Sequence, residues 1–233
     1  MQPSLFELAD YQRVMPLLRQ VGGFWCREDS ADDNLLLSRI ADDNWKYVKD
    51  LCADETWLDI GAHIGTFGAV IAPQVKHVIA LEACPETFEV LKLNTASAWN
   101  VECRRQAVVG AEQQTVRFHQ SRGRTMGRVV PAGARSYIEV PAVSFNSLLT
   151  QEVCVKMDIE GGEKDILDHL TDWSRIKRFL LEFHSKALKD DDHGYCKQVL
   201  ERFRANFQTV ATDFKESNHN WAWYIYGEKE PSV

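Results

Sequence analysis

Six ionisable side chains of this chain lie at or near the ends of short apolar runs. They are Asp59, Glu82, Asp158, Glu160, Glu182 and His184. Runs of this length and composition predict buried parallel strands. Because ligands bind beyond the carboxyl ends of the strands in parallel sheets, the sequence predicts that these side chains converge on one binding edge.

Acids and an imidazole at such an edge could take a proton from a bound molecule. We take Asp158, Glu160, Glu182 and His184 as the candidate catalytic bases, and His184 titrates nearest neutrality when unperturbed. A core histidine with a satisfied hydrogen bond is the alternative for His184. Our main interpretation assigns no metal, and a divalent cation held by these groups is kept as an alternative.

A glycine-containing turn follows the first of these runs. Residues 57–60 lead into Gly61 and Gly65, and residues 66–72 can begin a helix whose free N–H groups face a ligand. Glu82 comes 23 positions after Asp59, where an acid can accept hydrogen bonds from ribose hydroxyls. The turn lacks G-x-G-x-x-G, which disfavours an NAD-dependent oxidoreductase. A nucleoside without a pyrophosphate fits better, and S-adenosylmethionine (SAM) is the commonest such ligand.

The elements that position these residues alternate between strand and helix from residue 56 to residue 205. Residues 207–214 and 220–227 then predict two strands with no helix between them. The pattern predicts a doubly wound, mostly parallel α/β sheet with a C-terminal antiparallel hairpin. At 233 residues we expect one domain spanning 1–233, with its core at 55–227.

The segments outside this alternation are less regular. Residues 1–50 predict a helical cap, which includes a helix over 43–51. Residues 22–34 look like a loop, either a solvated connection or a cover over the ligand. Residues 101–109 predict a third strand, and residues 114–120 and 137–143 predict an added β-hairpin.

A basic segment interrupts an otherwise acidic chain. Residues 101–135 hold seven arginines and two acidic residues, a balance of +5, so the rest of the chain carries −12. Arg122, Arg124, Arg128 and Arg135 lie in the glycine-containing part of this segment. We take the first three as candidate substrate-binding residues for an anionic acceptor, because guanidinium groups bind phosphate and carboxylate. A solvated connection is the alternative.

Composition narrows the class of protein. Hydrophobic content of 45% is typical of a soluble globular protein. The net charge of −7 disfavours broad nucleic-acid binding. No apolar run approaches the roughly 20 residues that span a membrane, and the first residues do not form a signal peptide. The six cysteines are scattered without a C-x-x-C pair, so we expect free thiols and a cytoplasmic protein.

Three stretches resemble the FkbM family of SAM-dependent methyltransferases. They are residues 57–68, residues 79–89 and residues 155–163, the last reading Val-Lys-Met-Asp-Ile-Glu-Gly-Gly-Glu. This last stretch is similar to the K-x-D-x-E-G-x-E signature of that family. The resemblance covers roughly residues 55–185 and implies the class I methyltransferase fold with its seven-stranded sheet.

The resemblance also implies roles for individual residues. It implies O-methylation of a small molecule such as a sugar or natural-product intermediate, with Asp59 near the SAM amino group, Glu82 on the ribose and Asp158 near the sulfonium. The remaining cofactor-binding residues that it implies are Gly61, Ala62, His63, Gly65, Ala83, Gln106 and Ala107. The alternatives are a metal-assisted methyltransferase and a non-catalytic nucleoside-binding module.

Overall fold

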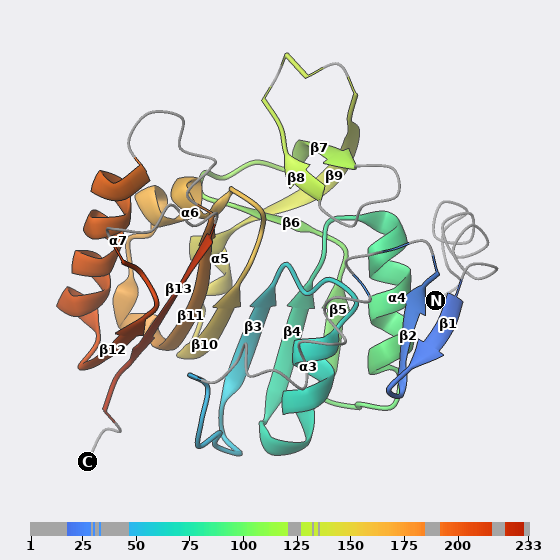
Figure 1. Cartoon of the computed structure of the whole chain (residues 1–233), viewed down its shortest axis with the longest axis horizontal. Coiled ribbons are helices and arrows are strands. Elements are labelled where there is room, and N and C mark those ends of the chain that lie inside the picture. Colours follow the sequence, from blue (N-terminus) through green and yellow to red (C-terminus); the bar gives the residue numbers. More distant parts are fainter. Residues whose placement is uncertain are drawn as a thin grey trace.

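The computed structural model describes residues 18–28, 30, 33, 47–120, 127–131, 133–134, 136–184, 192–215 and 222–230. These residues build a mixed α/β fold around one large sheet, with helices on both faces (Figure 1). The expected doubly wound α/β class is confirmed. Residues 1–17 of the expected helical cap lie outside the described residues.

The large sheet has seven strands. In spatial order they are β12 (Thr209–Thr212), β13 (Ala222–Glu228), β11 (Ile176–His184), β10 (Val153–Met157), β3 (Thr56–Ile60), β4 (His77–Leu81) and β5 (Val101–Arg104). The strands from β11 to β5 pair in parallel, and β13 pairs antiparallel with both β11 and β12. The predicted C-terminal antiparallel hairpin is therefore confirmed.

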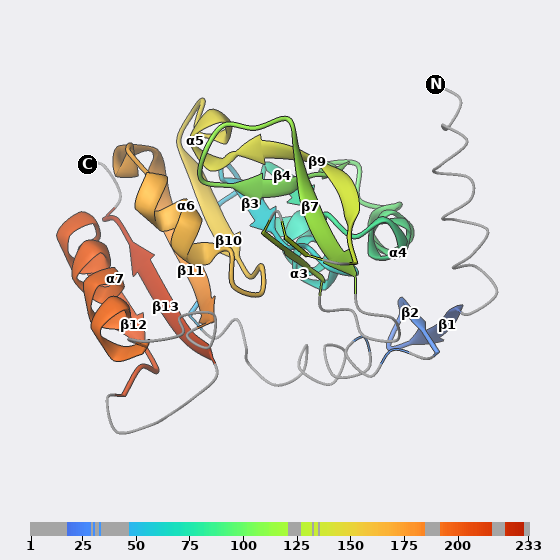
Figure 2. The same ribbon diagram turned by 90° about the horizontal axis from the view of Figure 1, so that it is seen from above.

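Helices cover the two faces of this sheet (Figure 2). One face carries α3 (Thr66–Ile71) and α4 (Pro85–Thr95). The other carries α5 (Phe145–Leu148), α6 (Glu163–His169) and α7 (Asp192–Asn206). Two short 3₁₀ helices, Ala72–Gln74 and Trp173–Arg175, lead into β4 and β11.

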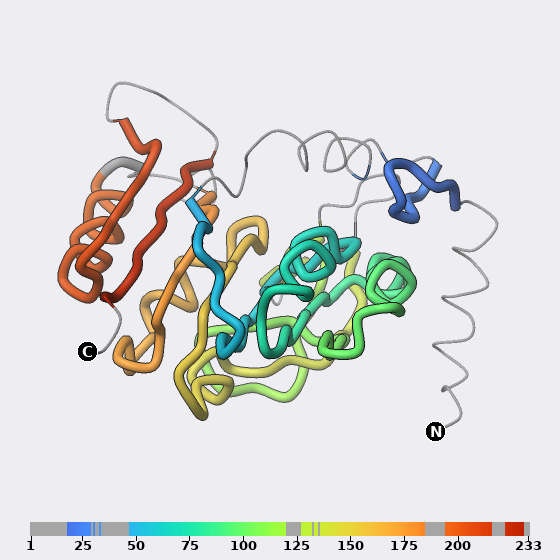
Figure 3. The backbone as a smooth tube through the Cα atoms, turned by 90° about the horizontal axis from the view of Figure 1, so that it is seen from below, coloured from blue at the N-terminus to red at the C-terminus, as the bar shows by residue number. Residues whose placement is uncertain are grey.

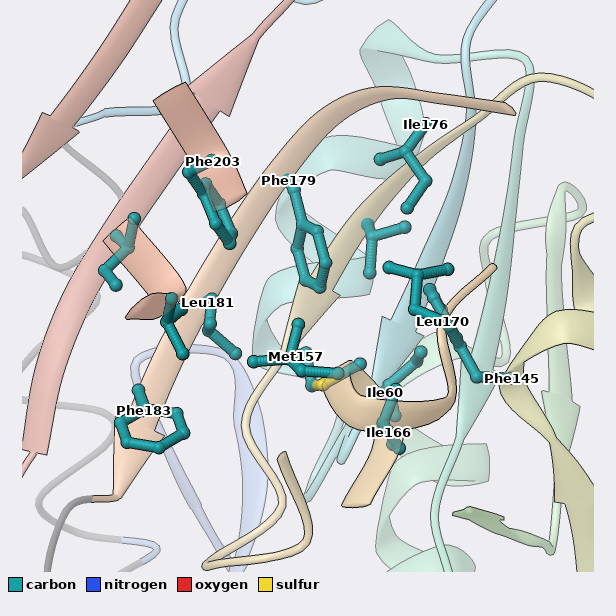
Figure 4. Close-up of a cluster of buried hydrophobic side chains, with 14 of the residues drawn as sticks. Ile60, Phe145, Met157, Ile166, Leu170, Ile176, Phe179, Leu181, Phe183 and Phe203 are labelled. Carbon is teal, nitrogen blue, oxygen red and sulfur yellow. The ribbon is translucent and has the colours of Figure 1, made fainter. Parts of the chain in front are cut away.

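The larger core lies between the sheet and the second helix layer (Figure 4). Ile60, Met157 and Leu181 point from three neighbouring strands toward Ile166 of α6 and Phe203 of α7. Every residue of β3 is buried, which explains why residues 57–60 form an almost uninterrupted apolar run. This packing fixes the carboxyl ends of β3, β10 and β11 relative to one another.

A second, four-stranded sheet stands beyond the carboxyl ends of the parallel strands (Figure 1). Its strands are β6 (Ala107–Val109), β9 (Ile138–Ser144), β7 (Thr115–Gln120) and β8 (Gly127–Val129). The antiparallel pairing of β7 with β9 confirms the predicted insertion hairpin.

The prediction of one strand over residues 101–109 is wrong. The chain leaves the large sheet after Arg104, and Gln106 donates its backbone N–H to the Arg104 carbonyl in a tight turn (3.1 Å). Residues 107–109 then pair in parallel with β9 and are buried in the small sheet. A local apolar pattern does not distinguish one strand from two strands in different sheets.

The N-terminal region also differs from the expectation. Residues 18–27 form a hairpin of β1 (Leu18–Val21) and β2 (Phe24–Arg27) in place of the expected helix and loop. Gly22 and Gly23 have positive φ angles of 57° and 87°, which two-residue hairpin turns favour. The hairpin packs beside α4 (Figure 3). Residues 47–50 are not helical, and residues 43–46 of the expected helix lie outside the described residues.

Among the described residues, we find no helix that is long and apolar enough to cross a membrane.

Candidate active site

The structure brings four predicted catalytic residues to the carboxyl ends of β10 and β11. His184 is the centre of the group and is 6% exposed. Its Nε2 lies 3.4 Å from Glu160 Oε2 and 3.9 Å from Asp158 Oδ1. Asp158 and Glu160 are partly exposed, so the cluster can be reached from outside the core.

Glu163 holds the histidine from the other side, and our sequence-based site did not include it. Glu163 Oε1 lies 2.9 Å from His184 Nδ1 and accepts the backbone N–H groups of Ile159 and Gly161 (both 3.2 Å). Burial alone would lower the pKa of His184, but Glu163 and the charges of Asp158 and Glu160 raise that pKa to about 10. The ring is therefore cationic at neutral pH, which makes His184 a poor proton acceptor.

Glu182 lies two residues earlier on β11. Tyr224 Oη donates a hydrogen bond to Glu182 Oε2 (2.7 Å) across the β11–β13 pair. Burial and the neighbouring Asp158 charge raise the pKa of Glu182 to about 7. A carboxyl group with such a pKa can take up a proton near neutrality.

Asp59 is buried beneath the glycine turn. Its side chain is 0% exposed, and Oδ1 lies 3.1 Å from Lys156 Nζ. Lys156 also donates to the Gly61 carbonyl (2.7 Å). Burial raises the pKa of Asp59, and the Lys156 charge opposes that shift. This pairing assigns Asp59 a role in holding the turn, and the Lys156 contribution was not predicted.

Gly61 and Gly65 have backbone conformations and surroundings that exclude a side chain. Gly61 has φ of 75°, and a Cβ there would lie 1.8 Å from the Asp158 carbonyl oxygen. At Gly65, with φ of 86°, a Cβ would lie 2.6 Å from Leu91 Cδ1. These contacts let the turn pack closely against the end of β10 and against α4.

Glu82 follows β4 directly and is 8% exposed. Its Oε1 accepts the Cys84 backbone N–H (2.8 Å) and its Oε2 accepts the His63 backbone N–H (2.9 Å). Burial raises the pKa of Glu82, while these two N–H groups oppose the shift. The carboxylate is thus fixed in orientation, and each oxygen retains a lone pair for a further donor.

The remaining predicted cofactor residues surround this carboxylate and the turn. Ala62 is buried in the turn, Ala83 is partly buried beside Glu82, and Ala107 is buried at the start of β6. Gln106 is partly buried in the turn between the two sheets. Of the predicted substrate-binding residues, Arg128 is exposed on β8. The other two, Arg122 and Arg124, lie outside the described residues.

One group of side chains could hold a metal ion. Among the described residues, single ligand atoms of Asp158, Glu160 and His184 all lie within 4.8 Å of one another. Glu160 has a positive φ of 58°, which is uncommon for a non-glycine residue. Two carboxylates and a neutral imidazole are ligands that divalent cations accept, so a cation here would have to displace the proton from His184 Nε2.

The parallel sheet with its antiparallel closing strand, and the acids gathered at its carboxyl edge, define a Rossmann-like α/β fold of the class I methyltransferase type. The sequence matches the family described as the methyltransferase FkbM domain over residues 59–210, more than half of the chain. The chain belongs to the FkbM methyltransferase family.

The chain is similar to several solved structures at low sequence identity, with TM-scores below 0.5. An rRNA methylase from Streptococcus thermophilus is 11% identical with a TM-score of 0.45, covering 77% of this chain and 89% of that one. A fibrillarin/Nop5p complex is 15% identical with a TM-score of 0.48, covering 84% and 81%. A precorrin-6y C5,15-methyltransferase from Geobacter metallireducens is 16% identical with a TM-score of 0.41, covering 77% and 82%. No curated protein matches the sequence.

Proposed function

We propose that this protein is a SAM-dependent methyltransferase that methylates a hydroxyl of a small molecule. The observation that carries the proposal is the Glu82 carboxylate at the end of β4, oriented by the N–H groups of His63 and Cys84. A carboxylate so placed beside a glycine turn suits the two hydroxyls of a ribose. The domain would comprise residues 1–233, with residues before 50 covering a core at 55–227.

The residues around the turn fit SAM. Glu82 would accept the ribose hydroxyls, and the turn from Gly61 to Gly65 would run along the methionine part. Because Asp59 is buried against Lys156, we assign the contact with the amino group of SAM to Asp158 or to a water molecule. Ala83, Gln106 and Ala107 would border the adenine. SAM would supply a methyl group activated by a sulfonium leaving group.

The protein must then align the acceptor and remove one proton. We assign Glu182 as the base that removes this proton from the acceptor. Its partly exposed carboxylate lies at the binding edge, and Tyr224 fixes its orientation. His184 would hold Asp158 and Glu160 in position, since both of its ring nitrogens face carboxylates. Arg128, with Arg122 and Arg124, would attract an acceptor that carries a phosphate or carboxylate.

Calorimetry with SAM and a turnover assay test this proposal. The wild-type chain should bind SAM and release S-adenosylhomocysteine when a hydroxylated, anionic acceptor is supplied from a screen. Glu82→Gln should weaken SAM binding by about 1.5–3 kcal/mol, because the ribose loses a charged acceptor. Glu89→Gln is the matched control, since Glu89 is a buried glutamate paired with Lys92 (2.7 Å). Binding without turnover on any acceptor would instead indicate a nucleoside-binding module.

The cluster of Asp158, Glu160 and His184 supports a second candidate, a metal-assisted methyltransferase. A cation there would lower the pKa of a bound acceptor hydroxyl. Titration with Mn²⁺, followed by electron paramagnetic resonance, tests this directly. Stoichiometric binding that is lost in Glu160→Gln and retained in Glu112→Gln, an exposed control, would favour the metal. Absence of binding would leave Glu182 as the proton acceptor.

A further inference from the structure

One amide side chain joins the N-terminal hairpin to both α4 and the glycine turn. Asn94 Oδ1 accepts the Trp25 backbone N–H (2.7 Å). Its Nδ2 donates to the carbonyls of Trp25 (2.9 Å) and Ile64 (2.7 Å). Cys26, Ile64 and Val90 form a small apolar cluster at the same place. The hairpin is therefore packed against α4 and against the glycine turn of the predicted cofactor site.

A buried ion pair continues this attachment beyond the hairpin. Arg27 donates to Asp33 through Nε (3.0 Å) and Nη2 (2.8 Å), and the two side chains are 9% and 0% exposed. The Arg27 backbone N–H and the Ser30 hydroxyl also donate to Asp33 (2.8 and 2.9 Å). Arg27 Nη1 reaches Thr87 Oγ1 in the first turn of α4 (3.0 Å). The pair thus links the N-terminal segment to the helix that begins next to Glu82.

The same pair contacts the glycine turn at His63. Asp33 Oδ1 lies 3.6 Å from His63 Nε2, and His63 has a positive φ of 52°. The His63 backbone N–H donates to Glu82 Oε2 (2.9 Å). His63 therefore contacts both Asp33 and Glu82, the carboxylate assigned to the ribose. A buried ion pair adds little net stability, so its main effect here is to fix positions.

We propose that β2, together with Ser30 and Asp33, forms one wall of the cofactor site, and that Arg27 and Asp33 are positioning residues that act on Glu82 through His63. This inference rests on the proposed function, because it concerns the binding of the same cofactor. The coupling is reciprocal: if the docked segment strengthens cofactor binding, the bound cofactor stabilises the docked segment by the same free energy.

The experiment uses the full chain and S-adenosylhomocysteine as the probe. The variant Arg27→Met/Asp33→Leu removes both charges together, so no unpaired charge remains in the interior and the fold should persist. We expect its dissociation constant for the probe to rise at least about tenfold, with the melting temperature near that of the wild type. A purely structural role would change the melting temperature and leave the dissociation constant unchanged.

A second buried ion pair provides the control. Glu55 Oε1 and Arg178 Nε lie 3.0 Å apart, with side chains 1% and 5% exposed, at the amino ends of β3 and β11. Glu55→Leu/Arg178→Met removes this pair, which also contacts Lys177 (3.2 Å) and Glu228 (3.1 Å), on the edge of the sheet opposite the proposed cofactor site. Its affinity for the probe should equal that of the wild type.

Hydrogen exchange on the wild-type protein gives a readout that does not depend on any variant. S-adenosylhomocysteine should slow exchange in peptides covering residues 18–28, where the Trp25 and Arg27 amides are hydrogen-bonded, and leave β12 unchanged. A wild-type protein that does not bind the probe would contradict the proposed function itself. Binding with no change in exchange, or with equal affinity in the Arg27→Met/Asp33→Leu variant, would overturn only this inference.

Discussion

Lys156 Nζ lies 3.1 Å from Asp59 Oδ1, and the two residues are directly opposite each other in the parallel pair of β10 and β3. Burial alone would lower the pKa of Lys156, but the carboxylates of Asp59 and Asp158 raise it, so the side chain remains charged. The same ammonium donates to the Gly61 carbonyl. One buried charge therefore connects the signature stretch of β10 to the glycine turn.

Replacing this lysine should destabilise the whole domain. Lys156→Met leaves the Asp59 carboxylate buried without its partner, which should lower the free energy of unfolding by about 3–5 kcal/mol. Urea denaturation followed by circular dichroism measures the change. The double variant Asp59→Leu/Lys156→Met should recover most of the loss. A single variant as stable as the wild type would show that the pair is not important for stability.

His63 should make stability depend on pH. Burial lowers its pKa from 6.5 to about 4. The negative charges of Asp33 and Asp158 oppose this shift, and the positive charges of Arg27 and Lys156 add to it. The neutral ring is favoured in the folded state, so its contribution is present above pH 6.5 and is lost as the pH falls toward 4.

The expected contribution is about 2 kcal/mol, reduced from the full shift because the side chain is 20% exposed. Measuring the free energy of unfolding between pH 4 and 7 tests the prediction. His63→Gln should flatten this part of the profile. Equal slopes in His63→Gln and the wild type would disprove the assignment.

Glu182→Gln should lower kcat by about 10²- to 10⁴-fold with the affinity for SAM retained, because the acceptor loses its base. Tyr224→Phe should cause a smaller loss, since it removes only the hydrogen bond that orients the carboxylate. Single-turnover assays with the identified acceptor measure both effects. Glu201→Gln on α7 is an exposed control, and wild-type turnover by Glu182→Gln would exclude Glu182 as the base.

Arg128→Ala should raise KM for the acceptor and make the rate less sensitive to salt, because an exposed guanidinium acts on an anionic ligand through a screened charge. The affinity for SAM should not change. Lys76→Ala, at an exposed site before β4, is the control for the loss of one positive charge. An acceptor that proves neutral would rule out this role for Arg128.

Residues with a strong local pattern were predictable from the sequence. Asp158, Glu182 and His184 end apolar runs, and the structure gathers them because those runs are neighbouring parallel strands. Glu163 was not among the predicted site residues, although it is the last acid of the signature stretch. Its burial against His184 depends on how α6 folds back onto β11, which no local pattern encodes.

Long-range ion pairs were not predictable. Arg27 and Asp33 lie in a segment without helical or strand periodicity, and their pairing requires α4 and the glycine turn to be in place. The Gly22–Gly23 dipeptide was the available hairpin signal. We interpreted the surrounding segment as a loop because it is unusually rich in aromatic and acidic residues.

The two faces of the small sheet differ in how tightly they are packed. Val116, Phe118 and Val140 are buried against Cys84, beside the residue assigned to the ribose. Arg117 and His119, at the alternate positions of β7, are partly exposed. A substitution at an outer position should therefore leave this packing intact, whereas a smaller side chain at an inner position should open a cavity beside Cys84.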